Sequence, residues 1–173
     1  MEFDLQPTLT GELVVVRPLR PDDFEELYRA ASDPLIWEQH PQSNRHERAV
    51  FKDYFDGAIA SGGAFAVIDR SSGRIIGSSR YWNLEPGSEV EIGWTFLERQ
   101  VWGGPYNAEL KALMIRHAFR FVERVVFVAG EDNVRSQKAL QKIGATFVAK
   151  TQRPGPDGVV RHNLVFEIVR ARS

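Results

Sequence analysis

The spacing of hydrophobic and polar residues predicts a chain in which strands and helices are mixed. Segments with apolar residues at helical spacing are expected to be helices, and short segments with alternating or continuous apolar residues are expected to be strands. The expected strands cover residues 12–17, 64–69, 74–81, 89–97, 125–129, 147–151 and 162–169, and the expected helices cover residues 22–31, 47–60, 106–122 and 134–143. Turn-forming residues at 70–73 and 154–158 predict two β-hairpins.

The strand at residues 89–96 has the most regular alternation. It places Val90, Ile92, Trp94 and Phe96 on one face and Glu89, Glu91, Gly93 and Thr95 on the other. Two carboxylates therefore share a face. If that face lines a cleft, partial desolvation would suit Glu91 to act as a general base. A solvated strand face is the alternative explanation, and it is the better one for Glu89.

A turn with the sequence WGGPYN connects this strand to the next helix. Gly104 is placed to be the N-cap and Pro105 the first helical residue, because the fixed φ of proline suits that position. Unpaired N–H groups and the positive end of the dipole make a helix N-terminus an anion site. The donors would be the backbone N–H groups of Gly103, Gly104, Tyr106 and Asn107. The turn thus predicts phosphate binding, although an ordinary strand-to-helix turn would look the same locally.

A second candidate segment, EDNVRSQKALQKIGA, opens the last helix. Asn133 has the chemistry of an N-cap, and Gly144 is placed to end the helix. Ser136 falls in the first turn, where its hydroxyl either points into a cleft or satisfies a local backbone group. Taken alone, both residues would be structural.

Composition narrows the functional classes. A chain of 173 residues with 43% hydrophobic content fits one compact domain, residues 1–173. The absence of cysteine excludes disulfides, thiolate zinc sites and an acyl-cysteine intermediate. The N-terminus lacks a signal pattern, and no apolar run approaches the roughly 20 residues of a membrane span. We therefore expect a cytoplasmic protein that does not enter a membrane.

The distribution of charge and the positions of the histidines narrow the functional classes only a little further. Acidic residues predominate before residue 110 and basic residues after it, which suits a polyanionic ligand unless folding mixes the two sets. Diffuse positive charge alone does not predict nucleic-acid binding. His40, His46, His117 and His162 have neither metal-ligand spacing nor a serine-triad signature, so we expect no metal site.

Taken together, the motifs resemble the GNAT N-acetyltransferase superfamily, in particular its RimJ/RimL-type branch. The resemblance covers almost the whole chain through ELVVVRPLRPDDFEELYRAASDP, GRIIGSSRYWN, VEIGWTFLERQVWGGPYNAELKALMIRHAF and DNVRSQKALQKIGA. It implies a central, mostly antiparallel twisted sheet of six to seven strands with about four helices, and acetyl-CoA as the cofactor.

The resemblance also implies site residues. The family's pyrophosphate loop falls on residues 100–105, that is on Gln100, Trp102, Gly103 and Gly104, with Pro105 in place of the last small residue. The backbone of Trp94, Thr95 and Phe96 would bind the pantetheine arm. The family's Asn-x-x-Ser motif falls on Asn133 and Ser136. The tyrosine that many members use as an acid is absent from residues 137–143, so Ser136 is the preferred proton donor.

The implied reaction is attack by a neutral amine on the thioester within a ternary complex, with Glu91 as the base, directly or through water. Trp37 and His40 lie where the family often places a substrate-gating loop, and Trp82 and Asn83 are further acceptor-site candidates. The acceptor amine stays open between a protein N-terminus, an amino acid, a polyamine and an antibiotic. A homodimer is also left open. The alternative function is a catalytically silent acyl-CoA-binding module, because of Pro105 and the missing tyrosine.

Overall fold

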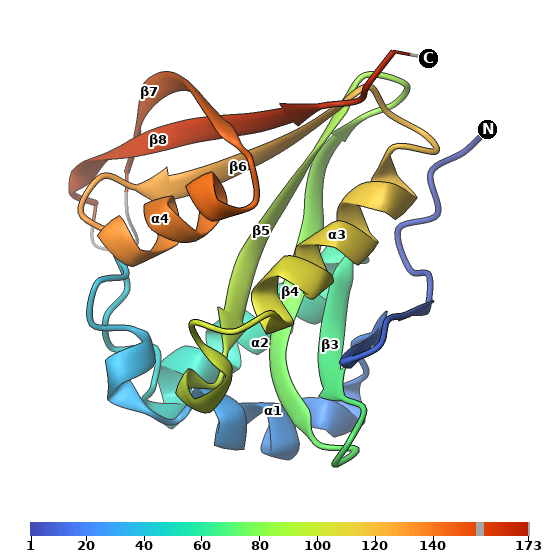
Figure 1. Ribbon diagram of the computed structural model, residues 1–173. Coiled ribbons are helices and arrows are strands. Elements are labelled where there is room, and N and C mark those ends of the chain that lie inside the picture. Colours follow the sequence, from blue (N-terminus) through green and yellow to red (C-terminus); the bar gives the residue numbers. More distant parts are fainter. Residues whose placement is uncertain (155–157, 173) are drawn as a thin grey trace.

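A single eight-stranded sheet runs through the protein in this computed structural model, which describes residues 1–154 and 158–172 (Figure 1). The strands follow the order β1-β2-β3-β4-β5-β6-β8-β7, and only β5 and β6 pair in parallel. The strands are β1 (Leu9–Thr10), β2 (Val14–Pro18), β3 (Ala64–Asp69), β4 (Ile75–Glu85), β5 (Glu89–Leu97), β6 (Arg124–Gly130), β7 (Thr146–Pro154) and β8 (Val160–Val169). The helices are α1 (Phe24–Ala31), α2 (Arg48–Ser61), α3 (Tyr106–Ala118) and α4 (Val134–Lys142).

This architecture confirms the expected mixed α/β fold with a mostly antiparallel sheet and four helices. The eighth strand is the two-residue β1, which is too short to give a sequence pattern and exists because it pairs with β2. Helix α3 ends at Ala118, earlier than the hydrophobic pattern predicts. The hairpin between β7 and β8 is confirmed, but its turn at residues 155–157 lies outside the described residues.

The helices cover the two faces of the sheet. Helices α3 and α4 pack on one face, and α1 and α2 pack on the other (Figure 1). Of the apolar residues at helical spacing in α2, Phe51, Tyr54, Phe55 and Ala58 are buried, whereas Val50 is only partly buried. Each large apolar side chain buried in this way contributes about 1.5–3 kcal/mol. Two separate cores therefore hold the sheet in place from either side.

Strand β5 does not alternate regularly to its end, which corrects the sequence prediction. Val90 and Ile92 belong to the α3 core, but Phe96 belongs to the α1/α2 core. The register with β4 shifts between Ser78↔Phe96 and Arg80↔Gly93, and Trp94 has a φ of 57°. An extra residue of this kind is a β-bulge, which moves all later side chains to the opposite face.

Strands β5 and β6 pair over a short distance and then separate. Their register has three pairs, from Glu89↔Arg124 to Glu91↔Val126. Beyond them the strands spread apart, with β4 on the outer side of β5 and β8 on the outer side of β6 (Figure 1). The sheet is thus opened at its centre.

Among the described residues, no helix combines the length and the apolar character needed to cross a membrane.

Candidate functional site

A cavity of about 560 Å³ occupies the opening between β5 and β6. Its strand walls are residues 92–97 of β5 and 127–130 of β6. Its helical wall contains Asn107 and Lys111 from α3 and Asn133, Ser136, Ala139 and Leu140 from α4. The third wall, which we call the loop wall, consists of Ile36, Trp37, His40, Pro41 and Arg45. Three cationic side chains and no Asp or Glu line the cavity in the described part of the chain.

The glycine turn borders the cavity through Trp102 and Gly103, beside the N-terminus of α3. Gly103 has a φ of 75°, a backbone conformation that favours glycine. Pro105 is the N-cap and Tyr106 begins the helix, one residue later than the sequence predicted for each role. The first intrahelical bond is donated by the Glu109 N–H to the Pro105 carbonyl. The N–H groups before Glu109 therefore precede the helical ladder, as an anion site requires.

The predicted loop residues divide between the cavity and the rest of the protein. Trp102, Gly103 and Asn107 line the cavity, whereas Gln100, Gly104 and Tyr106 are not among its lining residues. The Tyr106 hydroxyl donates to Asp69 Oδ1 at 3.0 Å.

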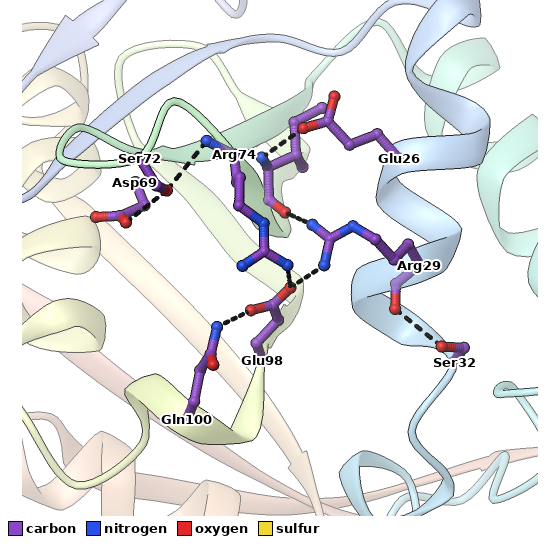
Figure 2. A network of polar contacts seen from close by, with 9 residues as sticks. Glu26, Arg29, Ser32, Asp69, Ser72, Arg74, Glu98 and Gln100 are labelled. Carbon is purple, nitrogen blue, oxygen red and sulfur yellow. Dashed lines mark hydrogen bonds and ion pairs between the residues drawn. The ribbon is translucent and has the colours of Figure 1, made fainter.

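The Gln100 side chain takes part in a separate polar network. Figure 2 shows it donating to Glu98, which also accepts from Arg29 at 2.8 Å. In the same network Arg29 donates to the backbone carbonyl of Ile75 in β4. This network fixes the end of β5 to α1, and it directs the Gln100 side chain to Glu98.

Helix α4 brings both of its predicted residues to the cavity. Asn133 is the N-cap, because its Oδ1 accepts from the Ser136 N–H at 3.2 Å. Ser136 lies in the first turn and lines the cavity. Gly144, with a φ of 90°, follows the end of the helix as expected. A structural role of Asn133 and a place in the site are therefore compatible.

Arg135 connects α4 to Leu35 and Glu38, which adjoin residues of the loop wall in the chain. Its guanidinium lies 4.2 Å from the centre of the Trp102 ring. One Nη pairs with Glu38 at 2.9 Å, and the other donates to the Leu35 carbonyl at 3.3 Å. The sequence analysis did not single out Arg135, because both partners come from a distant part of the chain.

The bulge in β5 determines the positions of the polar groups in the strand wall. The Tyr54 hydroxyl donates to the Trp94 carbonyl at 2.7 Å. Thr95 is turned toward α3, where its Oγ1 lies 2.5 Å from Lys111 Nζ and 2.8 Å from Ser79 Oγ. Trp94, Thr95 and Phe96 all line the cavity.

Lys111 is a site residue that the sequence analysis missed. It is 5% exposed, and burial lowers the pKa of its ammonium from 10.5 to about 7. One signal was available: Lys111 lies four residues after Asn107, and residues at that spacing share a helix face. The cavity therefore contains an amine that titrates near neutral pH.

The loop wall contains both predicted residues of this region. Trp37 is 3% exposed, and its Nε1 donates to the Ala31 carbonyl at 2.9 Å. His40 Nδ1 accepts from the Gln42 N–H at 3.0 Å. Burial, with the nearby Arg45 charge, lowers the pKa of His40 to about 3. His40 is therefore a neutral imidazole that carries its proton on Nε2.

Glu91, Trp82 and Asn83 lie together outside the cavity lining. Glu91 pairs with Trp82 across β4 and β5, and its Oε1 accepts from Asn83 Nδ2 at 3.4 Å. Gly93, which does line the cavity, is adjacent: a Cβ on Gly93 would lie 3.4 Å from Glu91 Oε2. The structure thus places Glu91 one residue from the cavity wall. Glu89 forms an ion pair with Arg124 at 2.7 Å and stays partly exposed on the strand.

The described residues contain no group of three or more His, Cys, Asp or Glu side chains that could hold a metal ion.

Comparisons with known proteins define the family of this fold. The family profile described as "Acetyltransferase (GNAT) domain" matches residues 14–146. A comparison with curated protein sequences finds no match.

Solved structures share the fold over most of their length. A GCN5-related N-acetyltransferase from Brucella melitensis is 22% identical with a TM-score of 0.83, covering 97% of this chain and 80% of that one. Mycobacterium smegmatis RimJ, in complex with CoA-disulfide, is 20% identical with a TM-score of 0.74, covering 94% and 87%. The microcin C7 self-immunity acetyltransferase MccE, in complex with acetyl-CoA and AMP, is 13% identical with a TM-score of 0.75, covering 92% and 94%.

Proposed function

The chain belongs to the GNAT acetyltransferase family and is an acetyl-CoA-dependent N-acetyltransferase, and we propose that it acetylates a primary amine by direct attack in a ternary complex. The acceptor is a protein N-terminal α-amine or a small-molecule amine. We place the chain in the RimJ/RimL-type branch, a placement supported by its motifs and by the fold it shares with RimJ. The observation that carries the proposal is the cavity between β5 and β6, which the glycine turn borders.

The donors around this cavity fit coenzyme A. The part of β5 that does not pair with β6 presents the backbone of Trp94, Thr95 and Phe96 to a ligand that runs between the strands. The N–H groups at the start of α3 suit a diphosphate. In this arrangement Gly103, Gly104 and Asn107 contribute to the phosphate site, while Gln100 and Tyr106 contribute through their backbone, because Glu98 and Asp69 hold their side chains.

Trp102 and the α4 residues complete the proposed cofactor site. The Trp102 ring lies beside the glycine turn under Arg135, where it would cover the cofactor. Asn133 and Ser136 face the same cavity from α4 and would contact the cofactor arm. Pro105 removes one N–H donor, but the N–H groups of Tyr106 and Asn107 follow it directly. The catalytically silent alternative therefore gains no support from Pro105.

The chemistry assigns one proton acceptor and one proton donor. Acetyl-CoA supplies a reactive thioester carbonyl. Glu91 accepts the amine proton through a water at Gly93, the position that separates its carboxylate from the cavity. Ser136 donates a proton to the departing sulfur from the α4 wall. Trp37 and His40 line the acceptor end, and Trp82 and Asn83 support Glu91 from β4 rather than contacting the acceptor.

A thiol-release assay with acetyl-CoA and a panel of amines tests the function. We expect turnover with at least one amine, and we expect Ser136→Ala to lower kcat by about a hundredfold with little effect on coenzyme A binding. Ala139→Ser, a change on the same helix wall, is the matched control for altered polarity. Coenzyme A binding without thiol release across the panel would instead support the silent alternative.

A further inference from the structure

Two arginines are buried next to the acceptor end of the cavity without a carboxylate partner. Arg45, on the loop wall, is 6% exposed, and Arg80, in β4, is 4% exposed. The Nε of each is buried with no hydrogen-bond partner. Arg45 donates to Gln42 Oε1 at 2.6 Å, but within residues 1–154 and 158–172 neither arginine forms an ion pair.

Both guanidinium groups lie near aromatic rings, and they share the ring of Tyr54. The Tyr54 ring centre lies 4.9 Å from Arg45 Cζ and 5.7 Å from Arg80 Cζ. Arg45 also lies 5.3 Å from the Trp37 ring, and Arg80 lies 4.4 Å from the Trp94 ring. Trp37 and Trp94 both line the cavity. Both positive charges therefore lie near the ring of Tyr54, and of the two arginines Arg45 lines the cavity.

Stacking on rings attracts these cations but does not neutralise them. Burial lowers the pKa of both guanidinium groups, and the charge of Arg80 lowers the pKa of Arg45 further. A buried charge without a counter-ion is strongly destabilising. Residues that destabilise the free protein in this way are typical of ligand sites, where the ligand supplies the missing charge.

The observed side chains indicate the kind of ligand. Guanidinium groups match the planar geometry of a carboxylate. The described lining of the cavity holds Arg45, Lys111 and Arg135 and no acidic side chain, so no negative charge there repels an anionic acceptor. We propose, building on the acetyl transfer proposed above, that the acceptor is a small amino-carboxylate of the amino acid class, whose carboxylate is bound by Arg45 at the cavity wall, with the charge of the neighbouring Arg80 adding to the attraction.

Paired substrates test the charge requirement. Each standard amino acid is compared with its carboxamide in the thiol-release assay. We expect kcat/KM for the accepted amino acid to exceed that of its carboxamide by more than about tenfold. Amine reactivity acts in the opposite direction, because removal of the carboxylate lowers the pKa of the neighbouring amine and leaves more of it neutral. Equal or better turnover of the carboxamides, or turnover confined to peptide N-termini, would overturn the proposal.

Substitutions test the two arginines. In Arg45→Met and Arg80→Met we expect the preference for the carboxylate to disappear and the melting temperature of the free protein to stay the same or rise. Arg48→Met is the matched control, since Arg48 also stacks on aromatic rings but pairs with Glu25 away from the cavity. It should keep the preference. A purely structural role would instead lower the melting temperature of the Arg45 and Arg80 variants and leave the preference intact.

A binding measurement separates this proposal from the proposed function. We expect the accepted amino acid to raise the melting temperature of the wild-type protein in the presence of coenzyme A, and to have no such effect on Arg45→Met. Stabilisation without thiol release would refute the acetyl transfer alone. Thiol release from amines with no stabilisation by any amino acid would refute the carboxylate site alone.

Discussion

At the scale of single residues, the unusual feature is that basic side chains in and beside the cavity are buried. Lys111 contacts Thr95 and lies 6.0 Å from the Phe127 ring, and no carboxylate within the described chain pairs with it. An ammonium in such a place costs stability while it stays protonated. A role in the cavity therefore explains the buried Lys111 better than a contribution to the stability of the fold does.

Lys111 makes stability depend on pH. Its pKa is about 7 in the folded protein and near 10.5 when exposed, so the unfolded chain binds more protons between these values and stability rises with pH. We expect the wild-type protein to gain about 2 kcal/mol between pH 7 and pH 9 relative to Lys111→Met. Urea unfolding of both proteins at several pH values measures this difference. If both proteins show the same pH dependence, burial does not lower the pKa of Lys111 in the folded protein.

Glu91 can be tested against a neighbour on the same strand. If its carboxylate takes up the amine proton, Glu91→Gln should lower the rate by about a hundredfold at low pH and by less at high pH, where more of the amine is already neutral. Glu89→Gln is the control, because Glu89 shares the strand and pairs with Arg124. A pH–rate profile of each variant decides the matter, and an unchanged profile for Glu91→Gln would remove it as the base.

At the scale of elements, what sequence could predict depended on whether the determinants were local. The side chain of Asn133 caps the start of α4, and Gly144 follows its end in a conformation that favours glycine, so both ends of that helix were predictable. The face of Phe96 was not, because the bulge at Trp94 depends on pairing with β4 and on the Tyr54 hydroxyl from α2. Regular alternation in a sequence gives no sign of a bulge that distant partners impose.

The same difference between local and distant determinants explains which residues of the candidate site could be predicted from the sequence. Glycines and the Asn-x-x-Ser spacing can be read along the chain, and they led to residues that line the cavity. Arg45, Arg80 and Lys111 have ordinary sequence surroundings. Their burial results from the assembly of α2, β4, β5 and α3, which no local pattern contains.

The glycine turn gives a prediction at this scale. Gly103 has a φ of 75° and open space around its missing Cβ, so Gly103→Ala should cost about 1–2 kcal/mol of stability through backbone strain alone. Gly103→Val should also weaken coenzyme A binding by more than about tenfold, since a side chain blocks close approach of phosphate to the backbone. Gly57→Ala within α2 is the control and should stabilise the protein. Calorimetry that finds full affinity in Gly103→Val would place the phosphates elsewhere.

At the scale of the whole molecule, charge is distributed unevenly between the surface and the cavity. Most ion pairs of the described residues lie on the outside, whereas the charged side chains in the described lining of the cavity are all basic. A cleft with one sign of charge attracts ligands of the opposite sign, and dissolved salt screens that attraction. The cations of the cavity come from both parts of the chain, Arg45 from the acidic part and Lys111 and Arg135 from the basic part.

Salt dependence follows from this arrangement. Coenzyme A carries phosphates and pantetheine does not, so raising the salt from 0.05 M to 0.5 M should weaken coenzyme A binding by about tenfold and leave pantetheine binding nearly unchanged. Titration calorimetry of both ligands measures the contrast. Equal salt responses would show that the cavity cations do not attract the phosphates.

The early end of pairing between β5 and β6 has a structural consequence of its own. Past Glu91 and Val126, two strand edges face each other across a gap, each with backbone groups that no neighbouring strand in the sheet satisfies. A ligand that lies in the gap and bonds to these edges takes the place of a missing strand. Binding is then also the completion of the sheet, because the ligand bonds to both of the edges that β5 and β6 leave open.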